Sequence, residues 1–201
     1  MRSNFLSKKE KIISNKFEKN GYIIFDIKQK KILSEVENVI VRYLKRHLKI
    51  SKTNPKKLLD NFHKHYPQKN LNKIRLKILT LINKSETIKR LYYQASKSML
   101  DIIVGNELVM QKKINLSIQM PQDDSSLLAL HSDIWSGDSP YEVVIWLPLV
   151  NCYKTKSMYI LKSSKYKKFE KRFKSLSKKN SETIFNQIKK DIIWLKIKKG
   201  Q

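Results

Sequence analysis

The hydrophobic period of this chain changes shortly after residue 105, and this change limits the folds open to it. Before it, apolar residues recur at three- and four-residue spacing, typical of amphipathic helices, in three segments: 31–48, 71–81 and 88–103. From Ile114 to Met120, apolar and polar residues alternate instead, which places each set on one face of a strand. Helices followed by short strands predict an α+β fold.

Further short strands are predicted where apolar runs are bounded by turn-forming residues: 22–25, 127–133, 142–149, 157–161 and 192–198. A loop containing Pro55 and Pro67 is expected between the first two predicted helices. A lysine-rich insertion at about 162–190 has aromatic residues at helical spacing, which we interpret as packing residues, and Ser181 as its helix cap. The sequence therefore predicts one domain over 1–201, mainly helical over 1–105 and strand-rich over 106–201.

The net charge of +26 raises the question of nucleic-acid binding. Only six of the 43 basic residues are arginine, the side chain that recognises phosphate and guanine in a bidentate manner, and the lysines are spread along the chain. We interpret them as a solvated surface without specific affinity for nucleic acid. A noncatalytic basic module that binds polyanions, such as nucleic acid or acidic polysaccharide, is the alternative function.

Segments that would direct the chain into or across a membrane are not predicted. The longest apolar run, 143–150, is far shorter than the ~20 residues that span a bilayer, and residues 1–11 lack a signal-peptide apolar region. The single cysteine, Cys152, cannot form an internal disulfide and is interpreted as a buried structural thiol. A cytoplasmic location is expected.

The candidate chemistry centres on His131-Ser132-Asp133. Residues two apart on a strand point to the same side, so an imidazole and a carboxylate would converge there. They would supply two of the three donors of a 2-His-1-carboxylate site for non-haem Fe(II). His63 and His65 form a second spaced pair, but in the predicted loop we interpret them as ordinary solvated residues.

Three segments carry a resemblance to a known family: NGYIIFD near the N-terminus, HSDIWSGDSPYEVVIWLPL, and KSMYILKSSKY. The chain resembles the Fe(II)- and 2-oxoglutarate-dependent oxygenases of the phytanoyl-CoA dioxygenase type, most closely a branch associated with bacterial surface-carbohydrate gene clusters. The resemblance implies a double-stranded β-helix, a jelly roll of cupin-like form, with N-terminal helices packed on it. It also implies Fe(II) as cofactor and 2-oxoglutarate as co-substrate.

Site roles follow from the same resemblance. It makes His131 and Asp133 iron ligands, places Trp146 and Gln119 at the 2-oxoglutarate pocket, and puts Trp135 and Asp138 in a loop that would contact substrate. The implied reaction decarboxylates 2-oxoglutarate to succinate and hydroxylates or oxidises a small, carbohydrate-related molecule. Packing in the core remains an alternative for Trp146, and ordinary turn chemistry remains one for Asp138.

The chain also departs from the family pattern. No histidine follows Asp133, so the third iron ligand and the basic residue that would hold 2-oxoglutarate have no counterpart, and Lys162 stands where the family usually has proline. The expectation is that the β-helix is incomplete at the C-terminus, as a fragment or a natural truncation, and that these 201 residues are inactive. A cupin-like sugar isomerase is a third possible function, but the set of histidine ligands usual in such enzymes is absent from the sequence.

Overall fold

A computed structural model of the chain describes residues 5–48, 54–123, 130–176 and 180–201. Its helices are α1 (Lys8–Asn20), α2 (Lys31–Leu48), α3 (Pro55–Asp60), α4 (Phe62–His65), α5 (Leu71–Asn83), α6 (Glu86–Ile103), α7 (Ser163–Leu176) and α8 (Ser181–Ile188). Short 3-10 helices are η1 (Gln68–Asn70), η3 (Asp133–Ser136) and η4 (Lys154–Lys156), and the strands are β1 (Tyr159–Leu161) and β2 (Ile192–Trp194). The predicted helices at 31–48, 71–81 and 88–103 are confirmed as α2, α5 and α6.

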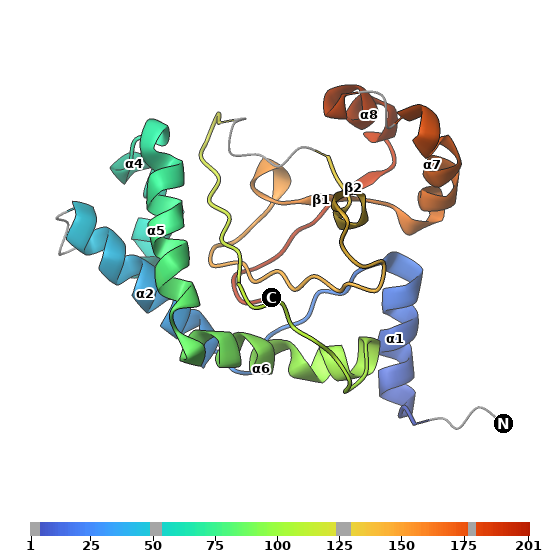
Figure 1. The fold of residues 1–201 in the computed structure, drawn as a ribbon, viewed down its shortest axis with the longest axis horizontal. Helices are drawn as coiled ribbons and strands as arrows, with labels where there is room; N and C mark the ends of the chain where they lie inside the picture. Colours follow the sequence, from blue (N-terminus) through green and yellow to red (C-terminus); the bar gives the residue numbers. More distant parts are fainter. Residues whose placement is uncertain (1–4, 49–53, 124–129, 177–179) are drawn as a thin grey trace.

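The first half of the chain forms a frame of helices around extended segments of the second half (Figure 1). Helix α2 packs on α5 and α6, and α6 reaches α1 at its other end. Helix α7 contacts α1, and α8 lies beside α7 at one corner of the molecule. The described segments between α6 and α7, 104–123 and 130–162, run largely between these helices (Figure 1).

The core lies between the apolar faces of α2, α5 and α6. Side chains at three- and four-residue spacing are almost fully buried there, among them Ile32, Leu44, Ile74, Ile78 and Ile88. The apolar residues of the alternating segment 114–120 pack against the same cluster, while the polar residues between them are exposed. Burial of this apolar surface is the main stabilising contribution to the fold.

Two helices that the sequence did not predict, α1 and α3, begin at capping residues. Helix α1 begins after Ser7, whose hydroxyl accepts a hydrogen bond from the Glu10 N–H while the Glu10 carboxylate accepts one from the Ser7 N–H. This reciprocal pair is a capping box. The prediction of a loop between Pro55 and Pro67 is wrong, because α3 and α4 occupy most of this segment. The Asn54 side chain caps α3 by accepting a hydrogen bond from the Lys56 N–H.

The insertion predicted at about 162–190 contains α7 and α8, with one correction. The cap of α8 is Asn180 rather than Ser181, since the Asn180 side chain accepts a hydrogen bond from the Thr183 N–H. Asn and Ser are about equally good caps, so the sequence alone did not decide between neighbouring residues.

The described strands form a two-stranded antiparallel sheet that continues as looser pairing. Strands β1 and β2 pair with Ile160 opposite Ile193, so the predicted strands at 157–161 and 192–198 are confirmed in part. Farther along, Cys152 and Ile197 exchange two backbone hydrogen bonds. Between the two regions lies η4, where Lys154 has a φ of 52°. This 3-10 turn interrupts the ladder.

Strand predictions at 22–25, 114–120 and 142–149 are wrong, since no strand is assigned in these segments. In the segments 114–120 and 142–149, side chains of helices form hydrogen bonds with backbone groups that a neighbouring strand would otherwise bind. The Tyr92 hydroxyl donates to the Ile145 carbonyl at 2.6 Å, and the Asn83 amide bonds both the N–H and the C=O of Ile114 at 2.8 and 2.9 Å. The double-stranded β-helix therefore stays a prediction.

Asn83→Ala tests this tethering of the extended segment. We expect the free energy of unfolding to fall by about 2 kcal/mol, because the half-buried N–H and C=O of Ile114 lose their partner. Asn38→Ala, at an exposed position within α2, makes the same substitution in a helix away from this segment and serves as the control. Urea unfolding followed by circular dichroism measures both. Equal losses in the two variants would contradict the tethering role.

None of the helices in the described ranges has the length and apolarity that a bilayer span requires.

Candidate functional site

The His131–Asp133 pair lies on a different backbone from the one predicted. Of the predicted strand 127–133, residues 127–129 lie outside the described residues, and Asp133 begins the 3-10 helix η3 after an extended Ser132. The strand prediction is wrong for 130–133. The two side chains nevertheless approach each other, with 3.5 Å between His131 Nε2 and Asp133 Oδ1. The extended Ser132 followed by a tight turn directs both side chains to one place.

Exposure of the pair leaves it accessible to a ligand from solvent. The His131 side chain is 48% exposed and that of Asp133 is 46% exposed. The two are therefore not enclosed by packed apolar groups. An imidazole and a carboxylate in this position form an ion pair when the ring is protonated, and they can share a metal ion when it is neutral.

The distance between the two donor atoms fits one metal ion. Donor atoms about 2.1 Å from a metal and at right angles to each other are about 3 Å apart. The observed 3.5 Å between Nε2 and Oδ1 therefore needs only a small side-chain adjustment. In the described part of the chain, no group of three or more His, Cys, Asp or Glu side chains is placed to hold a metal ion. The pair thus offers two of the donors that a 2-His-1-carboxylate site uses.

The loop after the pair is held by η3 and by the lysine-rich insertion. Asp138 is exposed, and its backbone N–H donates to the Asp133 carbonyl at 3.3 Å. Trp135, 38% exposed, stacks on Phe169 of α7 with ring centroids 6.2 Å apart and 26° between the planes. An aromatic residue two positions from Asp133 is therefore packed against α7, which makes this helix a neighbour of the candidate site.

The remaining predicted pocket residues come from two other segments. Gln119 is exposed on the segment 114–120, and Trp146 is half-buried on the segment 142–149. Their roles toward 2-oxoglutarate stay predictions.

The other histidine pair, His63 and His65, and the single cysteine, Cys152, do not form a metal site or a reactive nucleophile. His63 and His65 lie in α4, where residues two apart point to different sides of the helix and cannot converge on one ion. Cys152 is buried as predicted, and burial raises the pKa of its thiol, with Lys156 acting in the opposite direction. A raised pKa favours the unreactive thiol over the thiolate.

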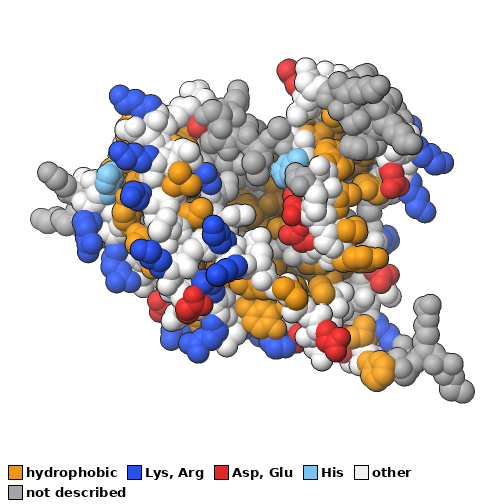
Figure 2. Space-filling view, viewed as in Figure 1, with side chains coloured by type: hydrophobic (Ala, Val, Ile, Leu, Met, Phe, Trp, Pro, Cys, Tyr) orange, Lys and Arg blue, Asp and Glu red, His pale blue; other side chains and the backbone are white. Residues whose placement is uncertain are grey.

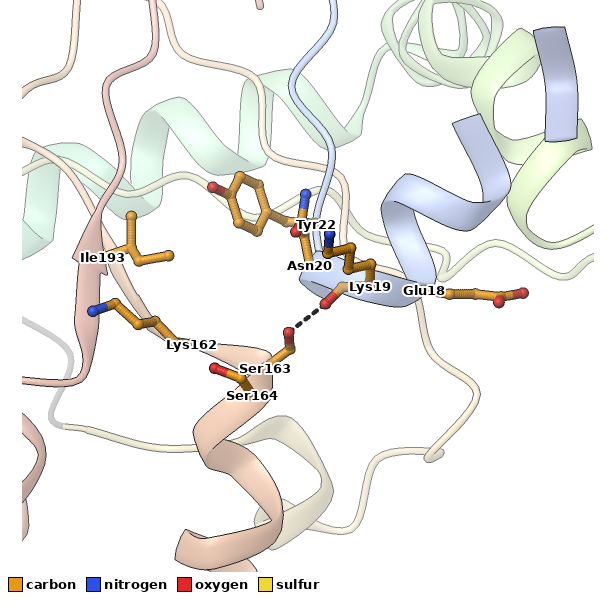
Figure 3. Close-up of a pocket in the computed structure, with 8 residues that line it drawn as sticks. All are labelled: Glu18, Lys19, Asn20, Tyr22, Lys162, Ser163, Ser164 and Ile193. Carbon is orange, nitrogen blue, oxygen red and sulfur yellow. Dashed lines mark hydrogen bonds between the residues drawn. The ribbon is translucent and has the colours of Figure 1, made fainter. Parts of the chain in front are cut away.

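A cavity of about 470 Å³ opens where the C-terminal end of α1 meets the N-terminal end of α7 (Figure 3). It is lined by Glu18, Lys19, Asn20, Tyr22, Lys162, Ser163, Ser164 and Ile193. The Ser163 hydroxyl donates to the Lys19 carbonyl across it. The Lys162 N–H donates to the Asp191 carbonyl at 3.0 Å. Proline, which the oxygenase family usually has at this position, has no N–H and could not make this hydrogen bond. This hydrogen bond gives Lys162 a local structural role.

Comparisons of the chain with protein-family models, with curated proteins and with solved structures found no match.

Proposed function

We propose that this chain is a domain of the Fe(II)- and 2-oxoglutarate-dependent oxygenase type, acting on a small, carbohydrate-related molecule. The observation that carries the proposal is the 3.5 Å approach of His131 Nε2 and Asp133 Oδ1 on half-exposed side chains. The sequence resemblance assigns iron to the same two residues. The proposal includes a cytoplasmic location, in keeping with a single, buried cysteine.

Each residue of the site has a separate task in this proposal. His131 and Asp133 bind the metal as two neighbouring donors. Trp135, held by Phe169, offers an aromatic face to the substrate. Asp138 accepts hydrogen bonds from substrate hydroxyl groups. When bound, Fe(II) together with 2-oxoglutarate supplies the oxidation of a substrate C–H bond, which the side chains alone cannot perform.

Two protein donors hold a metal ion less firmly than three, so the proposal includes weak iron binding and no turnover by the 201-residue polypeptide. Release of succinate that depends on both Fe(II) and 2-oxoglutarate would contradict this part of it. Such a result would leave the metal site itself standing.

The test is an anaerobic Fe(II) titration followed by tryptophan fluorescence. We expect Fe(II) to quench the emission of Trp135, two residues from Asp133, in a saturable manner. Removing either donor, in His131→Ala or Asp133→Ala, should raise the Kd at least about tenfold, since one of two coordinate bonds is lost. His63→Ala removes an exposed histidine outside the pair and should leave the Kd unchanged.

Fe(II) binding that is as tight in His131→Ala as in the parent would contradict the proposal. Loss of binding in His63→Ala would move the site to α4. Salt-sensitive binding of nucleic acid or acidic polysaccharide that persists in His131→Ala, without any iron binding by the parent, would favour the basic, noncatalytic module instead.

A further inference from the structure

A cavity of about 240 Å³ lies between α2 and α5, where the sequence predicts only a lysine-rich surface. Six residues from α2, η1, α5 and the turn after α4 line it: Tyr43, His47, Tyr66, Asn70, Lys73 and Lys77. It is smaller than the about 300–1,000 Å³ usual for drug-sized ligands, so it suits a small molecule or one group of a larger one.

Aromatic rings form one wall of the cavity. Tyr43 and His47, one turn apart on α2, stack with centroids 5.8 Å apart and only 8° between their planes. Tyr66 lies 5.9 Å from the His47 ring and stacks on Phe62 at 5.7 Å. Because Tyr66 is 7% exposed and Phe62 is buried, packing holds this wall in place.

Cations form another part of the lining. Lys73 and Lys77 are four residues apart on α5, so they extend from the same side of the helix. Within the described residues, neither lysine takes part in an ion pair, and no carboxylate lines the cavity. Lys and Arg side chains also gather over the part of the molecule where α2 and α5 lie (Figure 2). The cavity therefore has an unbalanced positive charge.

Neutral hydrogen-bond donors complete the lining. Burial, together with the neighbouring Tyr43 phenol, raises the pKa of Tyr66, so this phenol stays protonated at neutral pH and can donate. The Asn70 amide also offers N–H groups. Two ammonium groups with phenol and amide donors match an anion with several acceptor oxygens.

We propose that this cavity binds a small phosphate monoester, whose oxygens contact Lys73 and Lys77 and whose organic part lies on the stacked rings of Tyr43 and His47. Phosphate provides the dianionic charge and the acceptor oxygens that two lysines and neutral donors satisfy together. A flat or apolar organic group gains contact with the ring wall. The site uses none of the residues assigned to iron.

Isothermal titration calorimetry at constant ionic strength tests the proposal with three probes: inorganic phosphate, glycerol phosphate and phenyl phosphate. We expect saturable binding of all three, with phenyl phosphate the tightest because its ring stacks on the wall. Lys73→Gln and Lys77→Gln each remove one contact to phosphate and should raise the Kd about tenfold. The ring protons of His47 should shift in the NMR spectrum as phenyl phosphate is added.

Lys69→Gln is the matched control, because Lys69 is exposed in η1, lies outside the lining, and carries the same charge. It should leave the Kd nearly unchanged. An equal loss in Lys69→Gln would show general attraction to a chain of net charge +26 and would overturn the site. Phenyl phosphate binding no tighter than glycerol phosphate, or unshifted His47 signals, would overturn the role of the ring wall.

Discussion

Ile78→Ala should lower the free energy of unfolding by about 3 kcal/mol. The Ile78 side chain has no exposed surface and lies in the cluster that α5 shares with α2 and α6. Its truncation removes buried apolar surface and leaves a cavity that close-packed helices fill only in part. For a chain of this length, the melting temperature should fall by about 6–12 °C.

Leu76→Ala is the matched control, because Leu76 is on the same helix but 47% exposed. We expect it to cost less than about 1 kcal/mol. Urea unfolding of both variants, followed by circular dichroism, measures the difference. Equal losses in the free energy of unfolding would contradict the placement of Ile78 on the buried face of α5 and of Leu76 on its exposed face.

Gly200→Ala should lower the free energy of unfolding by about 2–3 kcal/mol. The residue has a φ of +80°, and a Cβ atom there would lie 2.7 Å from Leu33 Cδ1 on α2. The left-handed backbone costs a non-glycine residue about 1–2 kcal/mol, and crowding of Leu33 adds about 1 kcal/mol. The change would also disturb two backbone bonds, from the Gly200 N–H to Pro148 and from the Ile27 N–H to Gly200.

Gly21→Ala separates the two causes. Gly21 has a similar φ of +77°, but nothing lies within 4 Å of the Cβ position. This variant should therefore show the backbone cost alone, about 1 kcal/mol less than Gly200→Ala in thermal or urea unfolding. If Gly21→Ala cost as much as Gly200→Ala, the contact between the C-terminal segment and Leu33 would have no energetic role.

The major helices could be read from the sequence because their signal is local. In α5 the buried residues Leu71, Ile74 and Ile78 follow the helical period within the predicted segment 71–81. Ile82, one residue beyond that segment, is buried as well, whereas Leu81 is 39% exposed. Helix α1 also had a local signal in Ser7 and Glu10, the two ends of a capping box, although no residue of α1 is buried. It was missed because its apolar pattern is weak.

Strands were predicted less well because pairing is not a local property. The alternation at 114–120 predicts which side chains face inward, and these do pack on the core. It does not predict what the backbone bonds to. Asn83 lies 31 residues before Ile114, and Tyr92 lies 53 residues before Ile145. These two side chains nevertheless form hydrogen bonds with the backbone of the two segments. A pattern of hydrophobicity contains no information on such partners.

The candidate sites likewise combine contacts between residues close in the sequence, which could be predicted, and contacts between distant residues, which could not. His131 and Asp133 are close because only one residue separates them, so their proximity could be predicted although the strand was wrong. Contact between Trp135 and Phe169 joins residues 34 positions apart, and the cavity lined by Lys73 and Lys77 lies between α2 and α5. Lys73 and Lys77 were visible in the sequence only as two of many lysines.

By itself, the sequence determined helices α2, α5 and α6 with much of their inner faces, the high positive charge, and the nearness of His131 to Asp133, because each depends on residues a few positions apart. Only the tertiary structure decided what the extended segments bond to, which helix covers Trp135, and where lysines meet aromatic rings. These contacts depend on how distant segments pack, since backbone groups and side chains take whichever partner the fold brings near.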